Sequence, residues 1–109
     1  MTGAGTSPNY TIAGKQPILE TAEARVTLMT LAPGEATPWH RHSHVADTTF
    51  RLEGEAEVQA QEPDETIRLL PGVPCRMEPG RPHRVANAGP TPCRFLLVQG
   101  PGAYDFLKL

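Results

Sequence analysis

The sequence predicts an all-β domain, and three observations support this prediction. Ten glycines and twelve prolines make up about a fifth of the 109 residues, and proline is poorly tolerated inside helices. Short apolar or β-branched segments alternate with turn residues along most of the chain. In residues 55–61, alanine and valine alternate with glutamate and glutamine, which is the period of a strand with one dry and one wet face. A chain this short with eight to ten strands has to close into a barrel or a two-sheet sandwich.

Each expected strand is bounded by turn residues. The segment 24–31 (ARVTLMTL) is β-branched and mostly apolar, and Ala-Pro-Gly-Glu ends it. Pro38 favours an extended backbone over residues 37–42. Gly54, in the turn Glu-Gly-Glu, suits the positive φ that tight turns require. The expected strands or extended segments are residues 24–31, 37–42, 48–52, 56–60, 66–70, 75–77, 83–87 and 94–99, with residues 103–109 closing an edge.

Length and composition define the class of protein. A chain of 109 residues accommodates one domain, which we place at residues 9–109, after a flexible tail of small polar residues at 1–8. No signal peptide and no apolar run of about 20 residues is visible, so a cytoplasmic protein without a membrane partner is expected. Cys75 and Cys93 are then expected to be buried free thiols.

The charge pattern excludes several functions. Ten Lys and Arg against twelve Asp and Glu give a formal net charge of −2, and the basic residues form no run. Phosphate neutralisation needs a basic face, so nucleic acid is not an expected partner. The sequence contains no G-x-S-x-G, no Walker loop and no G-x-G-x-x-G.

The histidines carry the strongest functional signal. His40 and His42 are two apart in an expected extended segment, so both imidazoles can point to one face and meet one metal ion. His83 begins another expected strand, and Asp47 can supply a carboxylate oxygen. Taken alone, a His-x-His pair is more often a surface or structural feature, and His83 or Asp47 would be unremarkable. Counting the glycines together with the ligands strengthens the metal hypothesis.

The first glycine and histidine motif spans residues 34–54. It reads Gly34, five residues, His40-x-His42, four residues, Asp47, six residues, Gly54. A second motif spans residues 72–87.

That second motif reads Gly72, five residues, Glu-Pro-Gly at 78–80, two residues, His83, three residues, Asn87. The two motifs together resemble those of the cupin family. The departures are an aspartate where the family usually has glutamate in the first motif, and Glu78 where it has proline in the second. The resemblance covers residues 34–87, about half of the chain.

The resemblance implies a cupin-type double-stranded β-helix, that is, a jelly-roll barrel with a metal ion inside its mouth. By position, the implied ligands of one divalent transition metal (Fe, Mn, Ni, Zn or Cu) are His40, His42, Asp47 and His83. His44 is the rival to Asp47, because it has the same strand parity as His40 and His42.

Strand alternation predicts the lining of the barrel. If Asp47 points inward, Thr49 and Arg51 point inward too, whereas Phe50 and Leu52 point outward. A buried arginine needs a partner. Arg51 is expected either to pair with Glu78 or to hold a substrate carboxylate or phosphate. Thr49, Arg51 and Glu78 are thus the pocket candidates.

Two functions remain open at this point. An ion held by three histidines and a carboxylate keeps open coordination positions, which suits a metal-dependent enzyme of dioxygenase, isomerase or lyase type acting on a small polar or anionic molecule. The alternative is a non-catalytic module that binds or senses a small ligand. The apolar outer face carrying Phe50 and Leu52 predicts a homodimer.

Overall fold

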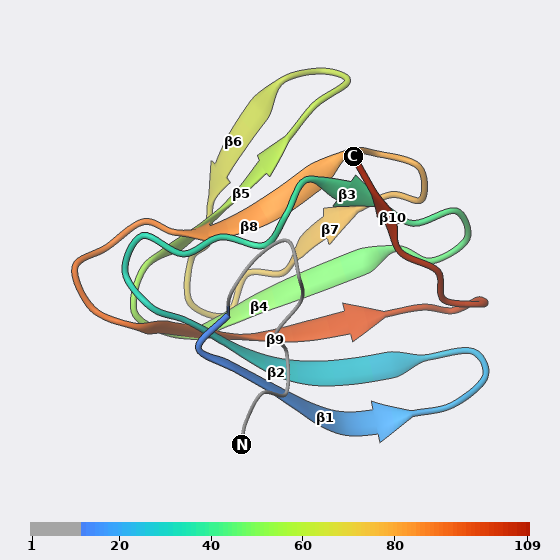
Figure 1. Ribbon diagram of the computed structural model, residues 1–109, viewed down its shortest axis with the longest axis horizontal. Helices are drawn as coiled ribbons and strands as arrows, with labels where there is room; N and C mark the ends of the chain where they lie inside the picture. The colour runs from blue at the N-terminus through green and yellow to red at the C-terminus, as the bar shows by residue number, and fades with distance from the viewer. Residues whose placement is uncertain (1–11) are drawn as a thin grey trace.

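The computed structural model describes residues 12–109, which form ten strands and no helix (Figure 1). The all-β prediction is therefore confirmed for this part of the chain; the expected tail at residues 1–8 lies outside it. The strands are β1 (Gly14–Glu20), β2 (Arg25–Leu31), β3 (His40–Arg41), β4 (Asp47–Glu53), β5 (Ala56–Ala60), β6 (Glu65–Arg68), β7 (Cys75–Met77), β8 (His83–Asn87), β9 (Cys93–Gln99) and β10 (Leu107–Lys108).

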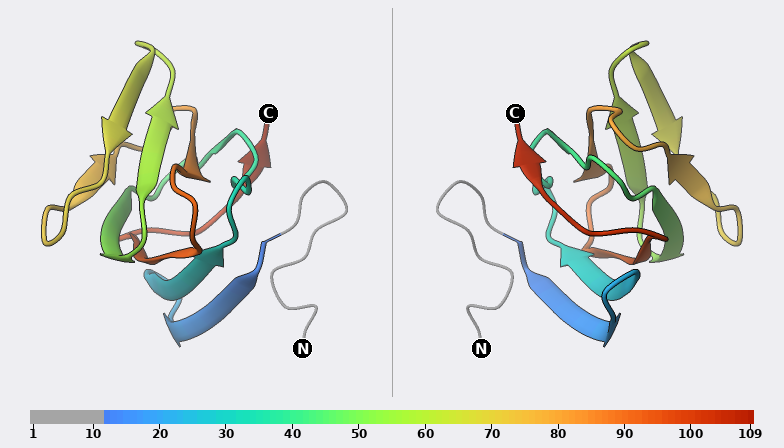
Figure 2. Two further views of the ribbon diagram at one scale, coloured as in Figure 1. Left: turned by 90° about the vertical axis from the view of Figure 1, so that its left-hand side faces the viewer. Right: turned by 90° about the vertical axis from the view of Figure 1, so that its right-hand side faces the viewer.

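Two five-stranded antiparallel sheets make up the fold. One has the strand order β1-β2-β9-β4-β7 and the other β10-β3-β8-β5-β6. Strands β1, β2, β9 and β4 lie side by side in Figure 1, and the second sheet lies above them. In the side views of Figure 2, the β5–β6 hairpin and the C-terminal strand β10 lie on opposite sides of the molecule, at the two ends of the second sheet. Residues 103–109 do close an edge, because β10 pairs with β3.

The core lies between the sheets and follows the alternation that the sequence predicts. In β5 every second residue is buried, as the alternating pattern requires. In β4, Asp47 and Thr49 are buried and Leu52 is 57% exposed, so the predicted parity is confirmed. The largest fully buried side chain is Phe95 on β9. Burying such a side chain stabilises the fold by about 1.5–3 kcal/mol.

Strand β1 is the element that sequence analysis missed. Its burial pattern shows no alternation, since five of its seven residues are exposed. It is an edge strand that pairs only with β2, and it contains Pro17, which edge strands tolerate. A half-exposed edge strand leaves no periodic apolar signal in the sequence.

One row of inward-facing residues crosses the first sheet and positions the site. Arg25 on β2 pairs with Gln99 on β9. Gln99 also pairs with Asp47 on β4, and Asp47 with Met77 on β7. Neighbouring strands are about 4.8 Å apart, so the backbones at Arg25 and Asp47 are separated by about 10 Å.

Two further expectations can be compared with the structure. Cys75 and Cys93 are both buried free thiols, as predicted, and burial raises the pKa of each thiol. Within residues 12–109 there is no helix of the length and apolar character needed to cross a membrane.

Candidate metal centre

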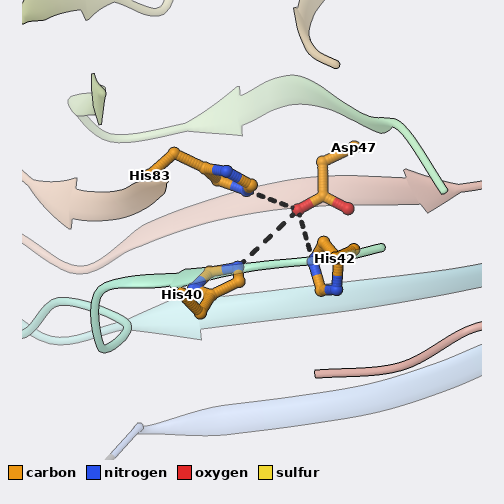
Figure 3. A group of neighbouring side chains, drawn as sticks. All are labelled: His40, His42, Asp47 and His83. Carbon is orange, nitrogen blue, oxygen red and sulfur yellow. Dashed lines mark hydrogen bonds and ion pairs between the residues drawn. The ribbon is translucent and has the colours of Figure 1, made fainter. Parts of the chain in front are cut away.

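The side chains of three histidines and one aspartate, which come from β3, the residue after it, β4 and β8, meet at one point (Figure 3). His40 lies on β3 directly opposite His83, the first residue of β8, and their ring centroids are 4.5 Å apart. His42 follows β3, and Asp47 begins β4. All four are buried, with exposed fractions of 2–6%. The two motifs therefore converge on one point, as the resemblance to the cupin family implies.

Each imidazole is held by a backbone carbonyl. Nδ1 of His40 is 2.7 Å from the carbonyl oxygen of Pro38, and Nδ1 of His83 is 2.8 Å from that of Arg81. Nδ1 of His42 is 2.5 Å from the carbonyl oxygen of Asp105. A carbonyl oxygen can only accept a hydrogen bond, so Nδ1 is the donor in all three rings. In the neutral ring Nε2 then carries the lone pair, which is the state a metal ligand needs.

The three Nε2 atoms all face one oxygen of Asp47. The Oδ2 atom is 2.7 Å from Nε2 of His83, 3.1 Å from that of His42 and 3.8 Å from that of His40. The Nε2 atom of Gln99 donates a 3.0 Å hydrogen bond to the other oxygen, Oδ1, and so fixes the carboxylate. An aspartate is thus long enough to reach the imidazoles from β4.

The electrostatics of this group call for a positive charge. Burial alone would raise the pKa of Asp47, but interactions with the side chains of His40, His42 and His83 hold the pKa well below its usual range. Burial alone would lower the pKa of His42, but its hydrogen bond to Asp47, the Asp47 charge, and the backbone and charge of Asp105 together raise it. With neutral rings, three nitrogen lone pairs would face an ionised oxygen. A shared proton or a metal ion relieves that repulsion.

The donor set fits a transition metal. The four ligand atoms lie within 4.8 Å of one another. Imidazole nitrogen with one carboxylate oxygen suits Fe, Mn, Ni, Zn or Cu. The hydrogen bonds on each Nδ1 and on Oδ1 supply the outer partners that metal ligands usually have.

His44 does not join this group. The prediction that it shares strand parity with His40 and His42 is wrong, because β3 ends at Arg41 and the chain bends at Ser43 and His44. The side chain of His44 is exposed. Asp47, its rival in the sequence, is the residue that faces the imidazoles.

The C-terminal segment covers one side of the histidines. The ring of Phe106 stacks on His40, with centroids 4.7 Å apart and planes 17° apart. The ring of Tyr104 lies 5.3 Å from that of His42. The backbone of Ser43 donates to the carboxylate of Asp105 at 2.7 Å, which anchors this segment beside the site.

A cavity of about 40 Å³ adjoins His40 and His42. About 10–15 Å³ of such space holds one water molecule, so the cavity has room for roughly three. Its wall includes Lys15 of β1, Arg25 of β2 and Gln99 of β9. This cavity is the space in which a ligand would meet the histidines.

The predicted pocket candidates Thr49, Arg51 and Glu78 do not line this cavity. Thr49 is buried further along β4. Arg51 donates to the carbonyl oxygen of Leu69 at 3.1 Å. Its predicted pairing with Glu78 is wrong, because Glu78 is exposed and pairs with Arg76 at 2.7 Å. Arg51 has the inward parity but lies four residues beyond Asp47, about 13 Å along the strand.

Sequence reasoning missed Lys15, Arg25, Tyr104 and Phe106 as residues beside the site. Arg25 is the second residue of the predicted strand 24–31 and has the correct parity, but nothing local indicates that it pairs with β9. Lys15 lies on the missed strand β1. The aromatic residues of segment 103–109 were a usable signal, since an edge strand there was already expected.

The comparisons with known proteins agree with this architecture. The family model described as the cupin domain matches residues 27–99. No curated protein matches the chain. Among solved structures, a protein with a double-stranded beta-helix domain from Klebsiella pneumoniae subsp. pneumoniae MGH 78578 is 28% identical, with a TM-score of 0.75, and the alignment covers 96% of this chain and 85% of that one.

Two further solved structures have the same fold. The TT1209 protein from Thermus thermophilus is 31% identical, with a TM-score of 0.75 and 88% of each chain covered. Oxalate decarboxylase from Bacillus subtilis is 21% identical, with a TM-score of 0.71, and the alignment covers 80% of this chain and 24% of that one. At 21% identity, the likeness to oxalate decarboxylase shows a shared fold and nothing more.

Proposed function

Because this chain belongs to the cupin family, we propose that it is a metal-dependent enzyme that acts on a small polar or anionic molecule in its barrel. One observation carries the proposal. Three imidazoles have their Nδ1 atoms committed to backbone carbonyls and their Nε2 atoms facing one carboxylate oxygen. That arrangement presents four metal-ligating atoms to a single ion. The side of the group that faces the cavity stays open to a ligand.

The residues of the chain have separate roles in this proposal. His40, His42, His83 and Asp47 would hold the ion, and Gln99 keeps the carboxylate in place through Oδ1. A bound divalent ion supplies Lewis-acid chemistry, such as polarising a carbonyl or lowering the pKa of a water molecule.

Metal analysis followed by activity screening tests the proposal. The purified protein is expected to contain about one transition-metal ion per chain by elemental analysis. Manganese is the first metal for reconstitution, since the Bacillus subtilis oxalate decarboxylase of the same fold has Mn(II) centres; Fe, Ni, Zn and Cu follow. Each form is then screened for oxygen uptake and for conversion of small hydroxy and carboxylic acids. A protein that retains none of these metals would refute the proposal. Metal binding and ligand binding without conversion in any form would favour the non-catalytic binding module.

Apolar residues on the outer face of the first sheet support the proposal that the chain pairs with a second copy of itself. Leu28, Leu96 and Phe50 form one row across β2, β9 and β4, and Leu52 beside them is 57% exposed. Apolar faces of this kind are rare on monomers and are usually covered. A homodimer with two-fold symmetry would place the same face of each copy together.

A charge on this face is expected to separate the dimer. In light scattering at tens of micromolar, the wild-type protein should have the mass of two chains, whereas Phe50→Lys should have the mass of one. Leu52→Lys serves as the milder variant, because its side chain already contacts solvent. Val73→Lys, at another exposed apolar position, is the matched control and should remain dimeric. A monomeric wild-type protein would contradict the prediction.

A further inference from the structure

The cavity beside the metal group has a cationic wall opposite the ligands. Arg25, Gln99 and Asp47 form the inward row across β2, β9 and β4. The backbone of Arg25 therefore lies about two strand spacings, or 10 Å, from the backbone of Asp47, whose carboxylate faces the histidines. A ligand between them would contact the metal group at one end and Arg25 at the other.

Arg25 is held in place and still has a donor to spare. Its Nη2 atom pairs with Glu20 at 2.7 Å, and its guanidinium carbon lies 3.9 Å above the centre of the Tyr104 ring. Its Nε atom is buried without a hydrogen-bond partner, and it is the single such side-chain atom among residues 12–109. Buried polar groups are nearly always hydrogen-bonded, so an unpartnered N–H on a residue that lines the cavity indicates a missing acceptor.

Lys15 adds a second positive charge to the same wall. It lies on β1 opposite Met29, whose side chain is buried in the core. Burial, and then the charge of Arg25, lower the pKa of Lys15, and the charge of Glu20 only partly opposes them. None of the residues that line the cavity is acidic. An anion placed in the cavity would relieve the repulsion between the two cations.

We propose that this cavity is a carboxylate subsite, in which Arg25 and Lys15 hold the acid group of a small carboxylic acid whose other end reaches the metal group. The proposal rests on the proposed function, and it names the substrate class for that site. It assigns the anion contact to two residues on strands β1 and β2. An anion contact was one of the two alternatives expected for Arg51. The Nη1 atom of Arg51 donates instead to the backbone carbonyl of Leu69, and Arg51 does not line this cavity.

The dimensions limit the acid to a short one. Space for roughly three water molecules corresponds to an acid of about two to four carbons. Charge-assisted hydrogen bonds from a guanidinium and an ammonium to a carboxylate are the strongest that side chains make. Methyl and ring surfaces of Met29, Leu97 and Phe106 form other parts of the wall, which suits the short carbon chain of such an acid.

Calorimetric titration of malonate tests the subsite. Malonate is titrated into the manganese-loaded protein, with malonamide as the uncharged molecule of the same size. We expect malonate to bind and malonamide to bind at least about tenfold more weakly, because the charge-assisted hydrogen bonds are lost. Arg25→Gln is expected to weaken malonate binding about tenfold or more, and Lys15→Gln by a smaller factor. Both variants should bind manganese within about twofold of wild type, since neither residue is a ligand.

The controls separate this proposal from the proposed function. Arg76→Gln removes an arginine that pairs with exposed Glu78 and should leave malonate binding unchanged. If Arg25→Gln does not fold, Arg25→Lys takes its place, because it removes the Nε donor and keeps the charge. Malonate binding by Arg25→Lys and by Lys15→Gln then decides the outcome. Malonate bound equally well by these variants and wild type, or malonamide bound as tightly as malonate, would overturn the subsite while leaving the metal centre intact. A protein that binds no metal would instead refute the proposed function. Malonate titration of that metal-free protein would still support or overturn the subsite.

Discussion

Replacing His83 with alanine is expected to reduce the metal content of the purified protein from about one ion per chain to nearly none. His83 has the shortest contact with the Asp47 carboxylate, 2.7 Å, and it comes from the second motif, on β8. Loss of an outer partner of a ligand already weakens metal binding by about 10–100-fold, so loss of the ligand itself should cost more. Elemental analysis after gel filtration measures the effect, with circular dichroism as the check on folding.

Three further variants make this result specific. His42→Ala should also lose the ion, because the Nε2 atom of His42 faces the same carboxylate oxygen. Asp47→Ala should behave likewise. His44→Ala should keep a full complement of metal, since the side chain of His44 is exposed. If the His83→Ala protein retained all of its metal, the two motifs could not be converging on one ion.

Replacing Gly54 with alanine is expected to lower the free energy of unfolding by about 2–5 kcal/mol, the sum of two costs. Gly54 has a φ of 73°, in the left-handed region that disfavours a side chain. An added Cβ atom would also lie 2.5 Å from the carbonyl oxygen of Pro92 and 2.7 Å from the Cα atom of Cys93. Both neighbours are backbone atoms, so relief requires a shift of the turn between β4 and β5 or of the start of β9.

Gly72→Ala provides the matched control. Gly72 has nearly the same φ, 75°, but an added Cβ atom would meet nothing within 4 Å. That variant should lose only about 1–2 kcal/mol, the conformational part alone. Urea unfolding of both proteins, with and without metal, measures the difference. Equal destabilisation by the two substitutions would mean that the contact with Pro92 contributes nothing.

The sequence was sufficient for the fold class because alternation and turn residues are local patterns. The convergence of the two motifs was implied by the resemblance to the cupin family. Alternation identifies β5, and Gly54 indicates its turn. The residues His40 and His42 share a face through their spacing, and the position of His83 depends on the second motif. The carbonyl hydrogen bond that fixes the tautomer of His42 could not be predicted, because it comes from Asp105, 63 residues further along the chain.

The cavity wall depended even more on long-range pairing. Arg25 lies beside the metal group because β2 pairs with β9, and β9 with β4. No local pattern specifies that order of strands. Arg51 was identified instead because alternation gives the face of a strand and carries no information about depth. The prediction thus selected an inward-facing basic residue on β4, Arg51, whereas the inward-facing basic residue beside the site is Arg25 on β2.

The hydrogen bond between His42 and Asp105 has a consequence for biosynthesis. The carbonyl that orients His42 is made 63 residues after His42 itself. At about 5–20 residues per second, a ribosome needs several seconds to cover that distance. For most of that interval the nascent chain has its first two histidines but lacks a complete β9, and throughout it lacks Asp105, which orients the ring of His42. Stable metal loading is therefore expected to follow synthesis of residue 105, so metal would enter a nearly finished barrel rather than guide its early folding.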